Sequence, residues 1–322
     1  MKAIRIHSFG GPEVLQCDEI AVSEPGENQA LVRVKAAGVN YIDAYHRSGL
    51  YKVALPFTTG VEGAGIIEKE GPGCEFSPGT RVAWTMTPGA NAEFAVVPSA
   101  RLVPIPDELG FDSAAAVMLQ GMTAHYLSET TFPAKSGDIA VVHAGAGGTG
   151  LLLIQMLKRR GTTVYTTVST KEKAALAKQA GADETILYKD VDFAARVREL
   201  TGGKGVNVVY DSVGLATYQG DLEILRPRGM LVLFGQSSGK VPPIDPIILS
   251  DKGSLFLTRP SLAHHTAERK ELLARATKVL SWVQDGTLRL RVERRYPLTD
   301  VAQAHRDLES RTTTGKLLIE VG

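Results

Sequence analysis

Residues 141–150 read VVHAGAGGTG, and the apolar segment LLLIQML follows directly at 151–157. A short apolar run that breaks into glycines and then resumes is typical of a strand, a tight turn and a helix. Without side chains in the turn, backbone N–H groups and the helix N-terminus can approach a pyrophosphate. Ala144, Gly147 and Gly150 form an A-x-x-G-x-x-G variant of the G-x-G-x-x-G pattern, which predicts a dinucleotide site.

The residues that follow strengthen this interpretation. The predicted helix ends at Lys158-Arg159-Arg160-Gly161, where cations and a glycine suit a helix C-terminus. Thr162 to Val168 is rich in β-branched residues and predicts a second strand. An ordinary glycine-rich turn without a ligand is the alternative, and the complete β-α-β unit disfavours it.

An absence indicates which dinucleotide is bound. Sites that prefer NAD usually carry an Asp or Glu about 20 residues after the glycines, where it binds the ribose 2′-hydroxyl. No acidic residue lies between Gly145 and Lys171, and the second strand leads instead into Ser169-Thr170-Lys171-Glu172-Lys173. Ser169 and Lys173 offer a hydroxyl and an ammonium to a 2′-phosphate, which a carboxylate would repel. We therefore predict NADPH as the cofactor, the alternative being that these lysines only solvate a helix start.

Composition excludes several other classes of protein. The chain has 322 residues, 43% of them hydrophobic, which is enough for two cores. The net charge is only +1 and no basic stripe is interleaved with aromatics, so a nucleic acid is not expected as the main partner. No apolar run reaches the ~20 residues of a membrane span and the N-terminus lacks a signal core, so we expect a cytoplasmic protein with no membrane partner. The two cysteines, Cys17 and Cys74, are too few for a disulfide framework, and we expect no metal site.

Residues 1–122 and the residues that follow them differ in pattern. The first part contains short, glycine-bounded or alternating strands, and the second alternates strands with helices, which favours a parallel sheet with crossover helices. The predicted strands of the second part are 141–144, 162–168, 184–188, 206–211, 230–235 and 255–259. The tail, with a predicted helix at 267–283 and an apolar end at 316–319, is expected to return to the β-rich part. We thus predict boundaries at 122/123 and 261/262, with 123–261 binding the dinucleotide and 262–322 completing the first domain.

The order of these parts resembles the medium-chain dehydrogenase/reductase superfamily, and the strings resemble its zinc-free, zeta-crystallin-like quinone oxidoreductase branch. Similar strings occur in the same order along nearly the whole chain: GGPEVL at 10–15, NYID at 40–43, RSGLY at 47–51, YDSVG at 210–214, FGQSSG at 234–239, TRPSL at 258–262 and ESR at 309–311. The resemblance implies an α/β fold, with a GroES-like β-rich catalytic domain and a Rossmann doubly wound parallel sheet.

The resemblance also implies what is missing. Zinc-dependent relatives carry a metal-binding Cys near Asn40 and a His between Gly60 and Glu62, where this chain has Val61. An alkoxide would lack its Lewis acid here, so we expect no alcohol dehydrogenase. A quinone is already electrophilic, and the protein mainly has to hold two flat rings together. The implied activity is transfer of reducing equivalents from NADPH to small quinones, which needs no zinc.

Candidate catalytic residues lie near the N-terminus. Asn40 could hydrogen-bond the nicotinamide ribose or the quinone oxygen, Tyr45 and Tyr51 could stack on the ring or donate a hydrogen bond, and Asp43 could orient one of them. Core or rim packing for the tyrosines, and a cap or turn role for Asp43, remain alternatives. Glu62 is interpreted as an inherited structural carboxylate.

Candidate cofactor residues are carried over from the resemblance. Gly147, Gly148 and Thr149 match the pyrophosphate turn, and Ser169, Lys173, Tyr188 and Arg311 match positions around the 2′-phosphate. The alternative for Tyr188 is a surface tyrosine, and the alternative for Arg311 is a solvated helix end. The remaining candidates are Asn40, Tyr41, Ile42, Thr123, Ser212, Val213, Phe234, Gly235, Gln236, Ser237, Leu257 and Arg259.

Two other functions stay open. Zinc-free relatives include enoyl and alkenal reductases, which deliver hydride to a carbon–carbon double bond, and a nucleotide-binding structural or RNA-associated protein is the option outside enzymes. His143 is expected to be packed or hydrogen-bonded rather than a catalytic base, and His264-His265 are not expected to bind metal. The resemblance implies a homodimer, for which the strand 255–259 is the candidate contact.

Overall fold

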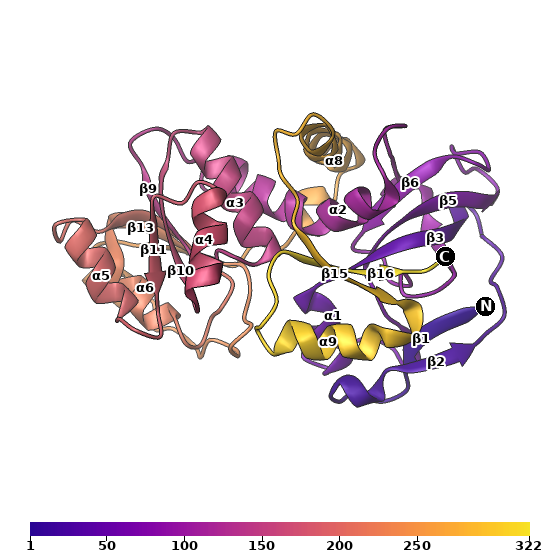
Figure 1. Cartoon of the computed structure of the whole chain (residues 1–322), viewed down its shortest axis with the longest axis horizontal. Coiled ribbons are helices and arrows are strands. Elements are labelled where there is room, and N and C mark those ends of the chain that lie inside the picture. Colours follow the sequence, from indigo (N-terminus) through magenta and orange to yellow (C-terminus); the bar gives the residue numbers. More distant parts are fainter. The chain divides into compact units, whose positions relative to one another are not determined.

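The computed structural model describes all 322 residues, Met1–Gly322. The chain divides into two compact units, of which unit 1 comprises Met1–Met122 with His265–Gly322 and unit 2 comprises Thr123–His264. The first division coincides with the predicted boundary at 122/123, and the second lies three residues beyond the predicted 261/262. Figure 1 shows the elements of both units. None of the helices has the length and apolar character needed to cross a membrane.

Unit 2 is built on a six-stranded sheet in the order β11-β10-β9-β12-β13-β14, and every neighbouring pair is parallel. Counted along the chain this order is 3-2-1-4-5-6, that of the doubly wound dinucleotide fold. The direction of winding reverses between β9 and β12, where such sheets bind their ligands. The predicted parallel sheet is therefore confirmed, with strands β9 Ile139–Val142, β10 Thr163–Val168, β11 Glu184–Leu187, β12 Val206–Asp211, β13 Leu225–Leu233 and β14 Phe256–Thr258.

Helices cover both faces of this sheet, α3 and α4 on one and α5 and α6 on the other (Figure 1). Buried apolar side chains of the strands and helices form its core, including Val141, Val209 and Leu231 from three neighbouring strands. The predicted helix after the glycines is confirmed as α3, with Gly161 just beyond its end at φ +76°. The helices are α3 Gly148–Arg159, α4 Lys171–Gln179, α5 Phe193–Leu200, α6 Tyr218–Ile224 and α7 Ile247–Asp251.

Unit 1 contains a three-stranded sheet, β2-β1-β4, and a seven-stranded sheet in which β15-β16-β3-β5-β6-β8 form the path and β7 pairs with β3. The C-terminal β16 pairs antiparallel with β3, so the end of the chain belongs to this β-rich unit. The strands are β1 Lys2–Ile6, β2 Gln16–Glu19, β3 Gln29–Val39, β4 Phe57–Thr58, β5 Glu62–Glu70, β6 Arg81–Thr85, β7 Phe94–Pro98, β8 Val103–Pro104, β15 Val292–Pro297 and β16 Lys316–Glu320.

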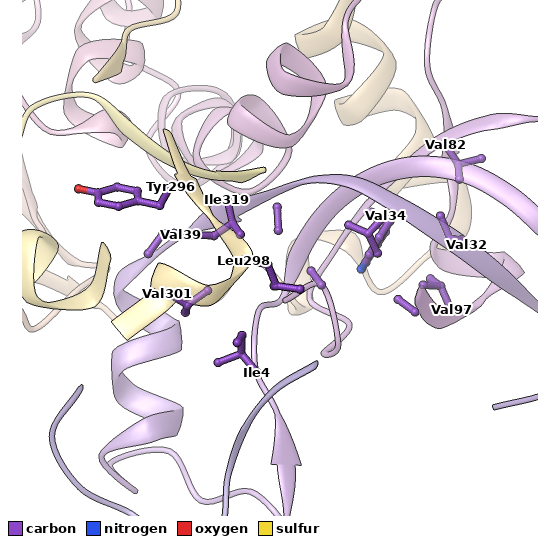
Figure 2. Close-up of a cluster of buried hydrophobic side chains, with 14 of the residues drawn as sticks. Ile4, Val32, Val34, Val39, Val82, Val97, Tyr296, Leu298, Val301 and Ile319 are labelled. Carbon is purple, nitrogen blue, oxygen red and sulfur yellow. The ribbon is translucent and has the colours of Figure 1, made fainter. Parts of the chain in front are cut away.

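The core of unit 1 is shared by segments from both ends of the chain. Figure 2 shows Val32 and Val34 of β3 in one cluster with Leu298, Val301 and Ile319 from the tail. Burying a side chain of this size contributes about 1.5–3 kcal/mol. The C-terminal segment is therefore an integral part of this unit's core.

Four helices belong wholly or partly to unit 1: α1 Tyr41–Arg47, α2 Phe111–Tyr126, α8 Arg269–Gln284 and α9 Val301–Glu309. The sequence analysis did not predict α9, a short segment rich in charged residues. It nonetheless packs inward, since Val301, Ala304 and His305 are all fully buried.

A buried polar cluster joins α1 to α9. The Arg47 guanidinium donates to both carboxylate oxygens of Glu309, at 2.9 and 2.8 Å, and to Nδ1 of His305 at 3.1 Å. Burial, together with the charge of Arg47, lowers the pKa of His305 to about 3. His305 is thus a neutral acceptor in the folded protein.

Replacing His305 with Gln is expected to make unit 1 less sensitive to acid. Because the folded pKa lies below the ordinary value of 6.5, protons favour the unfolded chain, and stability falls by about 1.4 kcal/mol per pH unit below 6.5. Between pH 7.5 and 5.0 the wild type should lose about 2 kcal/mol more than His305→Gln. Urea unfolding followed by the fluorescence of Trp84 and Trp282, both in unit 1, measures this. His7→Gln, at an exposed histidine, is the control, and equal pH dependence in wild type and His305→Gln would contradict the assignment.

Candidate functional site

The turn between β9 and α3 leaves no room for side chains at two glycines. A Cβ on Gly145 would lie 1.9 Å from Oγ1 of Thr166, and a Cβ on Gly150 would lie 2.5 Å from the carbonyl oxygen of Ala144. Gly145, Gly147 and Gly150 thus form a complete G-x-G-x-x-G. The predicted A-x-x-G-x-x-G at Ala144, Gly147 and Gly150 overlaps this pattern, and the structure adds Gly145, whose position packs against Thr166 of β10.

The N-terminus of α3 is open to a ligand. No side chain caps it, and Leu151 is the first residue whose N–H bonds back, to the Gly147 carbonyl. The N–H groups at 148–150 therefore have no acceptor within the helix and carry the positive end of its dipole. Gly147, Gly148 and Thr149 form this helix start, where such N–H groups can bind a pyrophosphate, and their contact with the cofactor stays a prediction.

Three of the residues predicted to bind the 2′-phosphate follow the ends of two adjacent strands. Val168 and Leu187 are paired in parallel register, so the next residues, Ser169 and Tyr188, lie side by side. The Tyr188 N–H donates to the Val168 carbonyl at 3.2 Å, and the tyrosine is 45% exposed. Lys173 follows in the first turn of α4. Arg311 belongs to unit 1, so its place beside these residues stays a prediction.

The loops after β12 and β13 bind one another through their backbones. Asp211, fully buried, accepts from the N–H groups of Val213 at 2.6 Å and Gly214 at 3.1 Å. The Ser237 N–H donates to the Ser212 carbonyl at 3.1 Å, and a Cβ on Gly235 would lie 2.5 Å from that same carbonyl oxygen. The candidates at this edge are thereby brought together: Ser212, Val213, Phe234, Gly235, Gln236 and Ser237.

The three remaining candidates of unit 2 are Arg259, Leu257 and Thr123. Arg259 donates to the Leu233 carbonyl at 2.7 Å, which joins the end of β14 to β13. Leu257 lies in β14 and is 36% exposed. Thr123 is buried in α2, at the first residue of the unit, and its predicted contact with the cofactor stays a prediction.

His143 is buried beneath this edge, as expected. Its Nδ1 lies 2.7 Å from Oγ1 of Thr167 and its Nε2 lies 2.7 Å from Oδ1 of Asp221, while Phe193 packs edge-on against its ring. Burial acts to lower the pKa of His143, but the neighbouring Asp221 carboxylate acts more strongly in the opposite direction. The pKa of His143 is therefore raised above its ordinary value. Burial raises the pKa of Asp221 to about 7. The pair links β9 to α6.

In unit 1, Asn40 lies at the N-terminus of α1 with its side chain fully engaged. Nδ2 donates to Oε2 of Glu62 at 2.8 Å and to the Gly38 carbonyl at 3.1 Å. Oδ1 accepts from Nζ of Lys316 at 2.8 Å and from Nε2 of Gln120 at 3.2 Å. Both amide protons and both lone pairs are thus used within the protein. A direct bond from this side chain to a ribose or a quinone would require breaking one of these four.

Asp43 caps α1, the alternative that the sequence left open. One of its carboxylate oxygens accepts from the Asn40 N–H at 2.8 Å, and the residue is 2% exposed. Burial raises its pKa to about 7, although the N–H of Asn40 and the charge of Lys316 act in the opposite direction. A role in orienting a tyrosine stays a prediction.

Aromatic rings cluster along α1 and just after it. The rings of Tyr45 and Tyr51 meet edge to face with centroids 5.2 Å apart, and Tyr41 approaches Tyr45 at 6.2 Å. Tyr51 is 37% exposed. The Tyr41 hydroxyl donates to the Leu308 carbonyl at 3.1 Å; burial raises the pKa of Tyr41, although the charge of Arg311 acts in the opposite direction. Ile42, the remaining candidate of α1, is half-buried.

Two family models match this chain. Residues 26–107 match the alcohol dehydrogenase GroES-like domain, and residues 148–278 match the zinc-binding dehydrogenase domain. A quinone oxidoreductase of Pseudomonas aeruginosa is 43% identical over 99% of both chains. The chain belongs to the quinone oxidoreductase family.

Other members of this family, and one relative with a different name, resemble the chain along its whole length. The Escherichia coli quinone oxidoreductase, solved in complex with NADPH, has 40% sequence identity, a TM-score of 0.97 and full coverage of both chains. A 2-haloacrylate reductase of Burkholderia is 40% identical over 98% of this chain and 97% of its own. The predicted resemblance and the GroES-like and Rossmann-like fold are confirmed.

One matching family model is described as zinc-binding, but the side chains of this chain do not fit a zinc site. No group of three or more His, Cys, Asp and Glu side chains is arranged to hold a metal ion. Asn40 offers an amide, position 61 carries a valine, and the Glu62 carboxylate that Asn40 contacts is already ion-paired with Lys316. An ammonium group cannot be a metal ligand.

Sequence reasoning missed Lys316 and Gln120 and underrated Glu62. Lys316 was noted only as the first residue of an apolar strand, and 254 residues separate it from Glu62. No local spacing relates such residues. A lysine directly before the apolar residues 317–319 was the one available signal.

Proposed function

We propose that this chain reduces small quinones to hydroquinones with NADPH. The observation that carries the proposal is the phosphate cradle of unit 2, where α3 has no side-chain cap at the G-x-G-x-x-G turn. The next strand, β10, is followed by Ser169 and then by Lys173 in α4, with no acid at its end. The similarity to quinone oxidoreductases over the whole chain supports the choice of acceptor.

The chain's own residues bind and orient the cofactor. The N–H groups at 148–150 receive the pyrophosphate, while Ser169, Lys173 and Tyr188, with Arg311, receive the 2′-phosphate. Backbone groups of the loops after β12 and β13 line the next part of the sheet edge. When bound, NADPH supplies a hydride, and a quinone that takes up this hydride and one proton becomes a hydroquinone.

The tyrosines of unit 1 form the acceptor side of the proposal. Tyr51 is 37% exposed, and its ring meets that of Tyr45 edge to face. A flat quinone can stack on such a surface, and the Tyr51 hydroxyl can donate to a quinone oxygen as negative charge develops there. Asn40 contributes indirectly, by fixing the N-terminus of α1, because its side-chain amide is already bonded to Glu62 and Lys316.

A comparison of acceptors tests this function. With NADPH as donor, the protein should reduce 1,4-benzoquinone at least about tenfold faster than a simple enone or 2-chloroacrylate, since a quinone needs no further polarisation. The similarity to 2-haloacrylate reductase makes reduction of a conjugated carbon–carbon double bond the second candidate. Turnover with the enone or haloacrylate alone would establish that second function. Tight NADPH binding without turnover of either acceptor would favour the structural or RNA-associated alternative.

Replacing Tyr51 with Phe is expected to lower kcat with benzoquinone about 10-fold and to leave the Kd for NADPH unchanged. The variant keeps the ring and loses a hydrogen bond that strengthens as charge develops, which is worth about 1–2 kcal/mol. Asn40→Ala should also lower kcat without changing NADPH affinity. Stopped-flow turnover and NADPH fluorescence titration measure the two quantities. Tyr218→Phe, on α6 of unit 2, is the control, and unchanged kcat in both Tyr51→Phe and Asn40→Ala would end the assignment.

Assembly and location complete the proposal. We propose a cytoplasmic homodimer formed through β14, an edge strand of the six-stranded sheet where Phe256 and Leu257 are 54% and 36% exposed. An exposed apolar edge strand favours pairing with a second copy. Nucleic acid is not proposed as a partner, because the net charge is only +1. Light scattering of wild type and Phe256→Lys tests the dimer.

A further inference from the structure

Lys316, Glu62 and Asn40 form a buried charged cluster at the N-terminus of α1. Lys316 Nζ lies 2.5 Å from Glu62 Oε2, and the two side chains are 3% and 0% exposed. The other oxygen of Glu62 accepts from the Leu119 N–H of α2 at 2.6 Å. One ion pair therefore connects the first residues of β5 and β16 with α2 and α1.

The backbone of β3 is shaped to admit this cluster. A Cβ on Gly38 would lie 2.3 Å from Glu62 Oε2, 2.6 Å from the Ala115 carbonyl oxygen and 2.7 Å from Lys316 Cε. Any other residue at position 38 would displace the ion pair or the backbone of α2. This steric requirement is independent of the hydrogen bonds and points to the same arrangement.

Stability alone does not account for such a pair. Removing two charges from water costs several kcal/mol for each ion, and apolar side chains of similar volume are often as stable or more stable in the same place. What charges supply and apolar groups cannot is orientation. An ammonium only donates hydrogen bonds and a carboxylate only accepts them. With Lys316 at Oδ1 and Glu62 at Nδ2, the amide of Asn40 has a single possible orientation.

We propose that Lys316 is a positioning residue, whose ammonium, held by Glu62, locks the Asn40 amide and thereby the N-terminus of α1 that carries Tyr41 and Tyr45. This inference deepens the proposed quinone reduction and rests on it. Lys316 contacts neither cofactor nor acceptor in this scheme. Its effect is on kcat, because small displacements of groups that orient reactants can cost about 100-fold in rate.

The test compares Lys316→Met with the double variant Lys316→Met/Glu62→Gln. The single variant leaves the Glu62 charge buried and unpaired, which threatens folding, whereas the double variant is uncharged and is expected to keep the wild-type fold. Lys69→Met/Glu24→Gln is the matched control, since it removes an exposed ion pair of the same unit, with side chains 57% and 76% exposed. The control should behave as the wild type in every measurement.

Two readouts separate positioning from structure. In NMR spectra of the protein without NADPH, the Asn40 side-chain NH2 protons should exchange slowly with solvent in the wild type and at least about tenfold faster in the double variant, although its melting temperature is retained. With benzoquinone the double variant should lose about 10- to 100-fold in kcat, with KM for NADPH changed less than about threefold. Primary alkylammonium ions should restore part of the rate to Lys316→Ala, because they return a donor to Asn40.

Each outcome has a distinct meaning. If wild type does not reduce benzoquinone, the proposed function fails, and NH2 exchange in the apo protein still decides whether Lys316 locks Asn40. If wild type is active and the folded double variant keeps both its kcat and its slow NH2 exchange, the inference is overturned. A loss of kcat that is accompanied by a lower melting temperature and is not rescued by alkylammonium ions would also overturn it, because this indicates a purely structural role.

Discussion

Replacing Gly145 with alanine is expected to raise the dissociation constant for NADPH about 10- to 100-fold. The new Cβ would lie 1.9 Å from Oγ1 of Thr166, which is itself held by a 2.6 Å hydrogen bond to the Val142 carbonyl. Thr166 is fully buried, so the turn has to move rather than the threonine. Such overpacking costs about 1–3 kcal/mol, and each 1.4 kcal/mol corresponds to tenfold in affinity. NADPH fluorescence titration measures the change.

The steric cause of this effect can be isolated. Adding Thr166→Ala removes the atom at 1.9 Å and should restore part of the affinity, a coupling that a double-mutant cycle quantifies. Gly110→Ala is the control, because a Cβ there meets nothing within 4 Å. Wild-type affinity in a folded Gly145→Ala protein would show that the turn between β9 and α3 does not set NADPH binding.

The second large effect concerns the choice between NADPH and NADH. Lys173→Ala is expected to raise KM for NADPH about 10- to 100-fold and KM for NADH less than about twofold, because hydrogen bonds to charged groups are worth about 1.5–3 kcal/mol and NADH lacks the 2′-phosphate. Arg311→Ala should act in the same direction. Steady-state kinetics with both cofactors at saturating benzoquinone measure this.

A neighbouring lysine supplies the control for that experiment. Lys171 is exposed at the first position of α4, two residues before Lys173 and on the same short segment after β10. Lys171→Ala changes the net charge equally and should leave both KM values within about twofold. If Lys173→Ala weakens NADPH and NADH to the same extent, the 2′-phosphate assignment is refuted.

Much of unit 2 was predictable because its signals are local. The glycine turn, the cationic end of α3 and the β-branched residues at 162–168 lie within one stretch of chain, and the strand 206–211 was predicted with its observed limits. The sequence was less informative where contacts between neighbouring strands determine which residue a position requires. Gly145 is needed because of Thr166 on the neighbouring strand, and this contact cannot be read from the spacing of the glycines. Similarly, β13 begins at Leu225, five residues before its predicted start.

The site of unit 1 was less predictable for a physical reason. The sequence indicated Asn40, Asp43 and the tyrosines as candidates, but whether a side chain is free depends on partners far along the chain. Asn40 is occupied by Glu62 and by Lys316, which lies 276 residues away. Asp43 proved to cap α1, since its carboxylate accepts from a backbone N–H three residues back. Residue type suggested chemistry here, and tertiary contacts decided between chemistry and support.

The most direct test of the account is the ratio of kcat/KM for NADPH to that for NADH, measured on the wild type with 1,4-benzoquinone as acceptor. Quinone turnover with a preference for NADPH of at least about tenfold is predicted, because Ser169 and Lys173 replace the acid that would bind the ribose hydroxyls of NADH. A preference for NADH, equal use of both cofactors, or no reduction of benzoquinone with either would contradict the account.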